Sequence, residues 1–333
     1  MRVLVTGGAG FIGSHLVKRL IREGESVTVL DNLSTGRKEN LDHLPNEDRL
    51  RFVNGDIRDR ENVKSCVKDA DRVVHLAAIA SVPYSIRKPA ETHDVNVDGT
   101  LNVLQACNEY NIAKLVYASS CAVYGEPRFI PVTEEHQFSA TSPYAESKIA
   151  SEAYCQFFRA EHHLQTVCLR VFNVYGTNQY NSDYGGVITQ FIDRLKKQEA
   201  PIIYGDGEQS RDFIHVDDVV ETIARVIRTP NDSDGTYNLG SGRATTINQL
   251  VRILQRILRD EEFKPVYAPP RLRDIRRSQA DIGKARRQLG FDPLISLEKG
   301  LERLVSAETN LAVAAVVQQR AGGLPKVGNA GNY

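Results

Sequence analysis

The sequence predicts an α/β protein built on a doubly wound parallel sheet, with a smaller C-terminal substrate-binding lobe. Three observations favour this fold. Short β-branched runs alternate with helical segments, a glycine-rich turn joins the first run to the first helix, and an acidic residue ends the second run. Strands separated by helices are typical of parallel sheets that helices cover on both faces.

Five apolar runs in the first half are expected to form buried strands, at residues 3–6, 26–30, 50–54, 72–76 and 114–118. The first crossover helix is expected at 16–21, with Leu16, Val17 and Leu20 turned toward the sheet. Right-handed crossovers follow from the general rule for parallel strands.

The alternation of strands and helices loosens after residue 176, where Gly, Pro and Asn cluster at 178–186 and 230–242. We therefore expect a first domain at residues 1–176 and a discontinuous lobe at 177–310, some segments of which return to the first domain. The tail, residues 311–333, ends in a Gly- and Asn-rich stretch and is assigned no function.

The composition is that of an ordinary globular protein, with 333 residues, 41% of them apolar and 25% charged. Lys plus Arg number 42 and Asp plus Glu number 42, so no net charge attracts nucleic acid or an acidic membrane. An anionic ligand must then be bound by local arginines.

The five cysteines form an odd set without CxxC spacing, which argues against a disulfide framework and a structural metal site. The N-terminal segment has no signal-peptide layout, and no apolar stretch approaches the ~20 residues that span a bilayer. We expect a cytoplasmic protein without a metal ion.

The glycine-rich turn has the GxxGxxG spacing of a dinucleotide-binding loop, with Gly7, Gly10 and Gly13 between the first strand and the first helix. A turn this tight needs backbone angles that a Cβ resists, and a pyrophosphate is bound at the helix N-terminus. The strand, the helix and the later acid disfavour the alternative of a glycine turn without a ligand.

Asp31 ends the second strand, where its carboxylate should accept hydrogen bonds from the adenosine ribose. A carboxylate repels the 2′-phosphate of NADP, so the sequence predicts NAD as the cofactor of residues 1–176. Arg37 is the one nearby feature that favours NADP, and its alternative is a solvated loop cation. Asp56 and Ile57 follow the third strand and are expected at the adenine, although Asp56 is also a candidate N-cap for a helix near Arg60.

Tyr144 and Lys148 are four residues apart at the start of a helix that Ser142 and Pro143 signal. Residues at this spacing share a helix face, so the lysine ammonium can lie close to the phenol. A phenol titrates near ~10, but a lysine cation and a positive nicotinamide ring both favour the phenolate. Tyr144 is therefore expected to act as a general base, with Ser120 at the end of the fifth strand relaying the proton.

These motifs, in this order, resemble those of the extended short-chain dehydrogenase/reductases, above all the UDP-glucose and UDP-N-acetylglucosamine 4-epimerases. The resemblance runs from Met1 to about Leu304 and rests on TGGAGFIG, DNLSTG, GDIRD, HLAA, YASSCAVYG, SPYAESK, LRVFNVYG and GDGEQSRDFIHVDD. It implies a Rossmann fold with tightly held NAD, a nucleotide-sugar lobe, and a homodimer joined by a four-helix bundle.

The resemblance implies an isomerase in which Tyr144 is the base, Lys148 holds the nicotinamide ribose and Ser120 assists at the sugar. The cofactor is expected to contact Gly7, Gly10, Phe11, Ile12, Gly13, Asp31, Asn32, Asp56, Ile57, Leu76, Ala77, Ala78, Asn96, Tyr144 and Lys148. The sugar nucleotide is expected to contact Ser81, Ser120, Tyr144, Asn173, Val187, Tyr204, Arg211, Arg271, Asp274 and Ser278. Arg211 has an alternative as an ion-pair partner of Asp212 or Asp217.

The implied reaction is oxidation of the sugar at C4 by hydride transfer to NAD, followed by return of the hydride to the other face. Dehydratases of the family carry Asp-Glu after the Ser or Thr, and decarboxylases carry Glu two positions after it. Cys121 and Ala122 stand there instead, so both reactions lack their acid/base group.

Cys121 raises one rival, because GDP-sugar 3,5-epimerase/reductases resemble this chain in having Ser-Ser-Cys. Their partner histidine is replaced by the segment 177–180, so Cys121 is interpreted as a small residue of the pocket wall. A UDP-glucuronate 4-epimerase and a non-catalytic NAD sensor remain as alternatives.

Two features favour acceptance of N-acetylated sugars as well as glucose and galactose. Ser278 matches a position that lines the sugar pocket in the resembling epimerases, where a bulky Tyr is associated with restriction to glucose and galactose. The segment 81–83 resembles that of N-acetylhexosamine epimerases.

Overall fold

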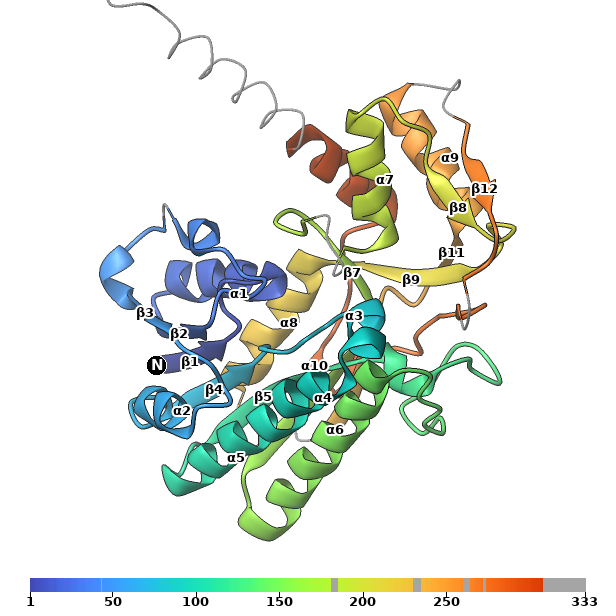
Figure 1. Cartoon of the computed structure of the whole chain (residues 1–333). Coiled ribbons are helices and arrows are strands. Elements are labelled where there is room, and N and C mark those ends of the chain that lie inside the picture. The colour runs from blue at the N-terminus through green and yellow to red at the C-terminus, as the bar shows by residue number, and fades with distance from the viewer. Residues whose placement is uncertain (43, 181–184, 230–234, 260–263, 272–273, 308–333) are drawn as a thin grey trace, which may run out of the picture.

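The computed structural model describes residues 1–42, 44–180, 185–229, 235–259, 264–271 and 274–307, so the expected tail at 311–333 lies outside the described residues. Within them, seven strands form one parallel sheet in the order β10-β6-β5-β4-β1-β2-β3 (Figure 1). The predicted doubly wound α/β fold is confirmed.

The five predicted strands are present with small shifts at their ends. They are β1 (Arg2–Thr6), β2 (Ser26–Asp31), β3 (Leu50–Asn54), β4 (Arg72–His75) and β5 (Lys114–Ser120). Two further strands complete the sheet, β6 (Gln165–Val171) and β10 (Gly235–Leu239). Because β10 follows residue 176 in the sequence, the C-terminal half contributes one edge of this sheet.

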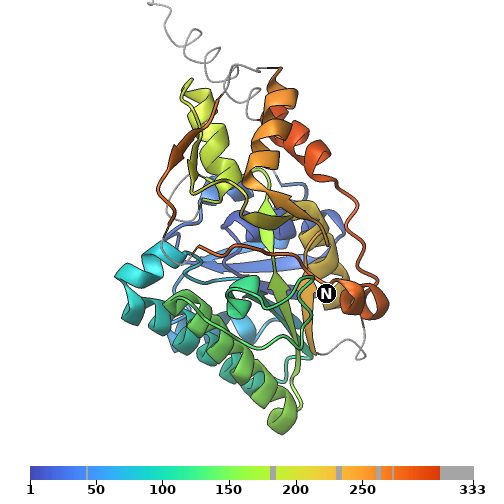
Figure 2. The same cartoon turned by 90° about the vertical axis from the view of Figure 1, so that its right-hand side faces the viewer.

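Helices cover both faces of the sheet, as Figure 2 shows for the green α6 and the orange α10. One buried cluster joins the sheet to α1 (Phe11–Arg22), α8 (Val216–Arg228) and α10 (Gly283–Leu289). The other joins it to α2 (Arg60–Val67), α5 (Gly99–Glu109) and α6 (Pro143–His162). Val3 and Val5 face the first cluster and Leu4 faces the second, which is the alternation that a strand buried on both sides requires.

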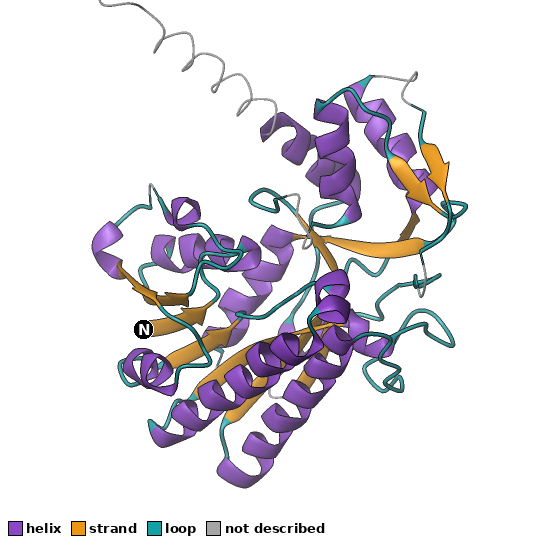
Figure 3. Ribbon diagram, in the orientation of Figure 1, coloured by secondary structure: helices purple, strands orange, loops and turns teal. Residues whose placement is uncertain are grey.

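A second, smaller body contains two short sheets, two helices named below, and helical residues 297–307, which pack on the same core (Figure 3). The sheets are β11 (Ala244–Thr246), β9 (Ser210–His215) and β7 (Asn173–Tyr175), and β12 (Val266–Ala268) with β8 (Ile202–Tyr204). With α7 (Val187–Lys196) and α9 (Ile247–Leu258) they bury a third core. Since β7 follows β6 almost directly, this body stands at the carboxyl end of the main sheet.

Short helices connect β4 to α5 at the edge of both bodies, namely α3 (Val82–Arg87) and α4 (Pro89–His93). None of the helices in the described part of the chain combines the length and the apolar character that a membrane span requires.

Candidate active site

A cleft of about 660 Å³ opens at the carboxyl end of the main sheet, between β1, β2, β4 and β5. A volume of this size suits a cofactor. It is lined by most of the predicted cofactor and catalytic residues, namely Gly7, Gly10, Phe11, Ile12, Gly13, Asp31, Asn32, Asp56, Ile57, Leu76, Ala77, Ala78, Ser120, Tyr144 and Lys148. We call it the dinucleotide cleft.

The glycine loop leaves no room for side chains at the positions the spacing singled out. A Cβ on Gly13 would lie 2.1 Å from the carbonyl oxygen of Gly7, and one on Gly7 would lie 2.7 Å from the amide nitrogen of Ala77. Gly7 also has a φ of +70°, which favours glycine. No side chain caps the N-terminus of α1 at Gly10, so its amide groups are available to a phosphate. This cradle fits the pyrophosphate of NAD.

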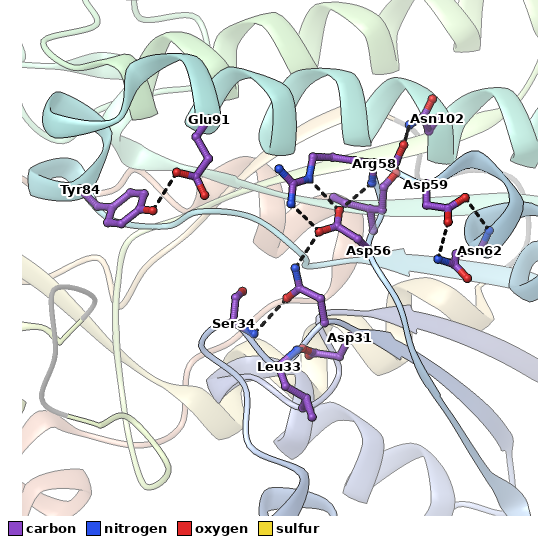
Figure 4. Close-up of polar contacts among 12 residues, drawn as sticks. Asp31, Leu33, Ser34, Asp56, Arg58, Asp59, Asn62, Tyr84, Glu91 and Asn102 are labelled. Atoms are coloured by element: carbon purple, nitrogen blue, oxygen red, sulfur yellow. Dashed lines mark hydrogen bonds and ion pairs between the residues drawn. The ribbon is translucent and has the colours of Figure 1, made fainter.

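Asp31 lies buried at the end of β2 and faces the cleft. Its carboxylate oxygens accept hydrogen bonds from the backbone amides of Ala9 and Leu33, both at 2.9 Å. Figure 4 shows Asp31 beside Leu33. Burial raises the pKa of this carboxyl group, and the two backbone hydrogen bonds oppose the rise. Asp31 therefore holds the glycine loop as well as facing the position predicted for the ribose.

Asp56 is tied into a polar cluster on the adenine side of the cleft (Figure 4). Its carboxylate accepts from the backbone amide of Arg58 at 2.8 Å, from the Arg58 guanidinium at 3.0 and 2.8 Å, and from Asn32 at 2.9 Å. The Arg58 side-chain bonds lower the pKa of Asp56 to about 2. The N-cap of α2 is Asp59, so the alternative of Asp56 as that N-cap is wrong.

Asn96 is a correction, because the structure places it behind the cleft rather than in its lining. Its buried side chain accepts from the amide of Ile79 at 2.7 Å and donates to the Ile79 carbonyl at 3.0 Å and to Ser147 at 2.9 Å. It therefore fixes the segment after β4 against α6. The spacing of a polar residue on a helix does not by itself reveal which way its side chain points.

Ser120, Tyr144 and Lys148 come together at the inner end of the cleft. Ser120 ends β5 and hydrogen-bonds Tyr144, which begins α6. Lys148 lies one turn later, donates to the carbonyl of Ala118 at 2.7 Å, and has its Nζ 6.0 Å from the centre of the Tyr144 ring. Ser142 caps α6 by accepting from the Ala145 amide at 3.2 Å.

Burial governs the protonation of these groups in the protein alone. It raises the pKa of Tyr144 to about 12, against the lowering effect of the Ser120 hydrogen bond. Burial also lowers the pKa of Lys148 to about 8, which nearby groups such as Glu152 partly oppose. In the protein alone, desolvation therefore favours the neutral phenol, and the expected joint effect of Lys148 and the nicotinamide ring stays a prediction.

A second cleft of about 420 Å³ adjoins the first and shares Ala80, Val174 and Gln179 with it. We call it the substrate cleft. It is lined by seven residues of the predicted substrate set, namely Ser81, Asn173, Val187, Tyr204, Arg211, Arg271 and Asp274. Ser278 is buried and does not belong to the described lining of either cleft, so the structure does not bring it to the pocket surface.

Arg211 donates to a carboxylate oxygen of Asp274 at 2.5 Å and to the carbonyl of Ile275 at 2.6 Å. The alternative pairing with Asp212 or Asp217 is therefore wrong. Asp212 instead accepts from Ser241, Gly242 and Ala280, while Asp217 lies near His15 and His215.

Arg271 places its guanidinium 4.0 Å from the centre of the Tyr204 ring, and both residues line the substrate cleft. Asn173 donates to the Asp212 carbonyl at 3.2 Å. The two arginines and the aromatic ring make this cleft suited to an anionic ligand with a flat ring.

Cys121 is partly buried against the main core, and burial raises the pKa of its thiol to about 12. It interacts with Ser120 and Arg211, which line the two clefts, but is not itself among the described lining residues, so its position in the pocket wall stays a prediction. All five cysteines are free thiols.

Several cleft residues were missed by sequence reasoning, among them Arg58, Tyr84, Asn178, Gln179 and Tyr180. In the sequence analysis, segment 177–180 served only to divide the domains and to exclude a partner histidine for Cys121. Its position directly after the LRVFNVYG motif was the available signal.

The dinucleotide cleft combines a glycine loop, an acid at the end of β2 and a set of Ser, Tyr and Lys side chains. This combination is typical of a dinucleotide-dependent oxidoreductase fold that acts on a substrate bound beside the cofactor. Residues 3–240 match the family model described as NAD dependent epimerase/dehydratase family. The chain belongs to this family, and the predicted NAD dependence and family resemblance are confirmed.

Three relatives show the range of the similarity. A putative UDP-glucose 4-epimerase of Methanocaldococcus jannaschii is 41% identical over 306 residues, 91% of this chain and 97% of the relative. The structure of a UDP-N-acetylglucosamine 4-epimerase from Methanobrevibacter ruminantium, in complex with UDP-N-acetylmuramic acid, has a TM-score of 0.88 and 39% identity, with 93% and 98% coverage. UDP-glucuronic acid decarboxylase 1 of Arabidopsis thaliana is 35% identical over 314 residues, 92% of this chain and 69% of the relative.

Proposed function

We propose that the protein is a UDP-hexose 4-epimerase that interconverts UDP-glucose with UDP-galactose, and UDP-N-acetylglucosamine with UDP-N-acetylgalactosamine. The observation that carries this proposal is that Tyr144 and Ser120 line the dinucleotide cleft, and that a second cleft sharing lining residues with it contains Arg211 and Arg271. The named substrates of the epimerase relatives support UDP as the nucleotide.

In the proposed mechanism, Tyr144 takes the proton of the sugar C4 hydroxyl while Ser120 hydrogen-bonds the same oxygen and relays the proton. Lys148 stabilises the phenolate and, through its position one turn away, holds the ribose beside it. The glycine loop and Asp31 would hold NAD, which would supply the hydride acceptor and donor needed for oxidation and re-reduction at C4. No second substrate is consumed.

The protein has no net charge, so the positive charge for an anionic ligand comes from the arginines of the substrate cleft. The Arg211 guanidinium is suited to bidentate binding of a diphosphate, and Asp274 occupies that position in the protein alone. On this proposal the diphosphate displaces Asp274 from Arg211, which releases the carboxylate for a ribose hydroxyl. Tyr204 offers a ring against which the nucleotide base can stack.

Decarboxylation is disfavoured although a decarboxylase is among the relatives. The position two residues after Ser120, which carries Glu in the resembling decarboxylases, is Ala122. The Cys121 thiol, whose pKa burial raises to about 12, is a poor acid/base substitute. A 4-epimerase acting on UDP-glucuronate remains the second candidate, since its reaction needs no further acid/base group.

The decisive experiment incubates the protein separately with UDP-glucose, UDP-N-acetylglucosamine and UDP-glucuronate, and resolves each sugar from its C4 epimer. Formation of UDP-galactose supports the proposal, and epimerisation of the uronate alone supports the second candidate. Loss of carbon dioxide from the uronate contradicts both. Absence of turnover with every sugar tried indicates an NAD sensor instead.

We predict that UDP-N-acetylglucosamine is accepted and that Ser278→Tyr selectively depresses this reaction by steric exclusion. Because Ser278 is buried, a tyrosine there must displace its neighbours, so the variant's fold and NAD content are checked before its rates are compared. Epimerisation rates of both sugars are compared in the variant and in Ser278→Ala. Equal loss on the two sugars, or rejection of the acetamido sugar by the wild type, shows that Ser278 is not the gate.

We also propose that the protein is a cytoplasmic homodimer joined through α5 and α6. Tyr110, Tyr154 and Phe157, at the end of α5 and on α6, have exposed fractions of 38%, 38% and 52%. Exposed aromatic residues on adjacent helices favour a protein interface. Light scattering on the purified protein measures its mass, and a monomer at micromolar concentration contradicts this assignment.

A further inference from the structure

The segment that follows β7 is joined by hydrogen bonds to residues beside the glycine loop. Figure 1 shows the loop after β7 reaching toward α1. Its residues Thr177–Tyr180, which we call the strap, leave the second body and contact residues of the first. Asn178, Gln179 and Tyr180 also line the dinucleotide cleft. The strap is therefore a wall of the cleft that belongs to the opposite half of the chain.

Two contacts fix the strap to α1. The imidazole of His15 hydrogen-bonds the carbonyl of Thr177 at 3.0 Å. One residue later, the side-chain amide of Asn178 donates to the hydroxyl of Ser14 at 3.3 Å. Both partners lie in the first turns of the helix whose N-terminus faces the pyrophosphate position.

The far end of the strap is held by Tyr180. Its hydroxyl donates to the side-chain oxygen of Asn40 at 2.8 Å, and its ring lies 3.7 Å from the guanidinium carbon of Arg37. Asn40 in turn donates to the carbonyl of Ala9 at 2.9 Å, and the Arg37 amide donates to the same carbonyl at 3.0 Å. Tyr180 is thereby linked through two residues to the glycine loop itself.

The arrangement also gives a contact for Arg37. Arg37 is exposed, as expected for a solvated loop cation, it is not among the described lining residues of the dinucleotide cleft, and its guanidinium lies over the Tyr180 ring at a distance typical of a cation–π contact. Its role is in the attachment of the strap.

We propose that Thr177–Tyr180 retains the cofactor, and that NAD leaves the cleft only after Tyr180 has separated from Asn40 and Arg37. A ligand enclosed between the glycine loop and the strap cannot depart while the two remain joined, so the stability of the Tyr180 contacts sets the dissociation rate. The inference depends on the NAD dependence of the family and not on the proposed sugar reaction.

The test measures the dissociation of radiolabelled NAD from the full-length protein during a chase with excess unlabelled NAD. Tyr180→Phe removes one hydrogen bond and keeps the stack, so we expect dissociation about fivefold faster. Tyr180→Ala removes both contacts, and we expect dissociation about 20-fold faster. Arg37→Ala should accelerate release in the wild type but add little to Tyr180→Ala, because the two residues act as one unit.

Tyr267 provides the matched control. It is another exposed tyrosine whose hydroxyl donates to an asparagine oxygen, that of Asn248 at 3.1 Å, and it lies outside the described lining of the dinucleotide cleft. Tyr267→Ala should leave the NAD dissociation rate within twofold of the wild type.

Two results overturn the inference. One is an NAD dissociation rate in Tyr180→Ala within twofold of the wild type, whatever the effect on the sugar KM, since the strap then serves the substrate cleft. The other is equal acceleration by Tyr267→Ala, which indicates general loosening. Because cofactor release is measured directly, the test gives its answer even if no UDP-sugar is epimerised.

Discussion

Replacing Lys148 by Met tests how the protein converts a buried phenol into a base. Burial raises the pKa of Tyr144 to about 12. Bringing that pKa to about 7 requires about 7 kcal/mol of preferential stabilisation of the phenolate, at 1.36 kcal/mol for each pH unit. The Ser120 hydrogen bond, the Lys148 cation and the positive nicotinamide ring of bound NAD are the groups that can provide it.

The share of Lys148 follows from its distance. The Nζ atom lies 6.0 Å from the centre of the Tyr144 ring. Coulomb's law with an effective dielectric constant of about 20 gives about 3 kcal/mol at this separation, which corresponds to about two pH units. We therefore expect Lys148→Met to move the acidic limb of the rate profile about two pH units higher and to reduce the rate at pH 7 by about 100-fold.

The direction of each limb follows from the protonation state that the reaction needs. The rate rises with pH as Tyr144 loses its proton, and it falls as Lys148, whose pKa burial lowers to about 8, loses its own. The wild type should give a bell-shaped profile, and Lys148→Met should lose the alkaline limb while its acidic limb moves upward.

The assay is the epimerisation rate between pH 6 and pH 10, with bound NAD quantified in each sample so that cofactor loss is not mistaken for lost chemistry. Tyr144→Phe serves as the reference without a base and should keep its fold and NAD while losing most turnover. If the acidic limb of the pH–rate profile lies at the same pH in Lys148→Met as in the wild type, the electrostatic role of Lys148 is refuted.

Two further predictions concern buried carboxylates. Asp31→Ala should weaken NAD binding and relax discrimination against NADP. Because this change also removes the acceptor of two backbone amides, Asp31→Asn separates the loss of charge from the loss of loop support. An unchanged ratio of NAD to NADP affinity in both variants would show that Asp31 is not at the ribose. Glu152→Gln leaves the buried guanidinium of Arg170 without its counter-charge. Urea denaturation should therefore show that the free energy of unfolding falls by about 3–5 kcal/mol. A decrease below about 1 kcal/mol would contradict this account of the ion pair.

Much of the main sheet and the glycine loop could be predicted from the sequence because their signals are local. The β-branched runs ended within one or two residues of the strands in the structure, and the glycine positions follow from steric limits within a single turn. The helix that carries Tyr144 and Lys148 was likewise marked by its own cap and proline. Each of these features depends on neighbours in the sequence.

The substrate cleft could not be predicted in the same way, because distant segments build it. Arg211 and Asp274 are 63 residues apart, and nothing near either residue in the sequence indicates that they pair. Edge strand β10 was missed for a related reason, since it pairs with β6 across a long separation. For Asn96 and Ser278 the residue type suggested a role in binding. The direction of each side chain depends on packing between distant segments, which the sequence pattern does not show.

The cleft that shields the reaction from water also makes its base inactive in the protein alone. Burial that raises the pKa of Tyr144 to about 12 leaves about one phenol in 10⁵ ionised at pH 7, and burial also reduces the charge available on Lys148. On the proposed mechanism, the positive nicotinamide ring of bound NAD would favour the phenolate of Tyr144 in the same cleft. Proton removal by Tyr144 would then depend on the presence of oxidised cofactor. A sugar hydroxyl would accordingly lose its proton only when a hydride acceptor is in place.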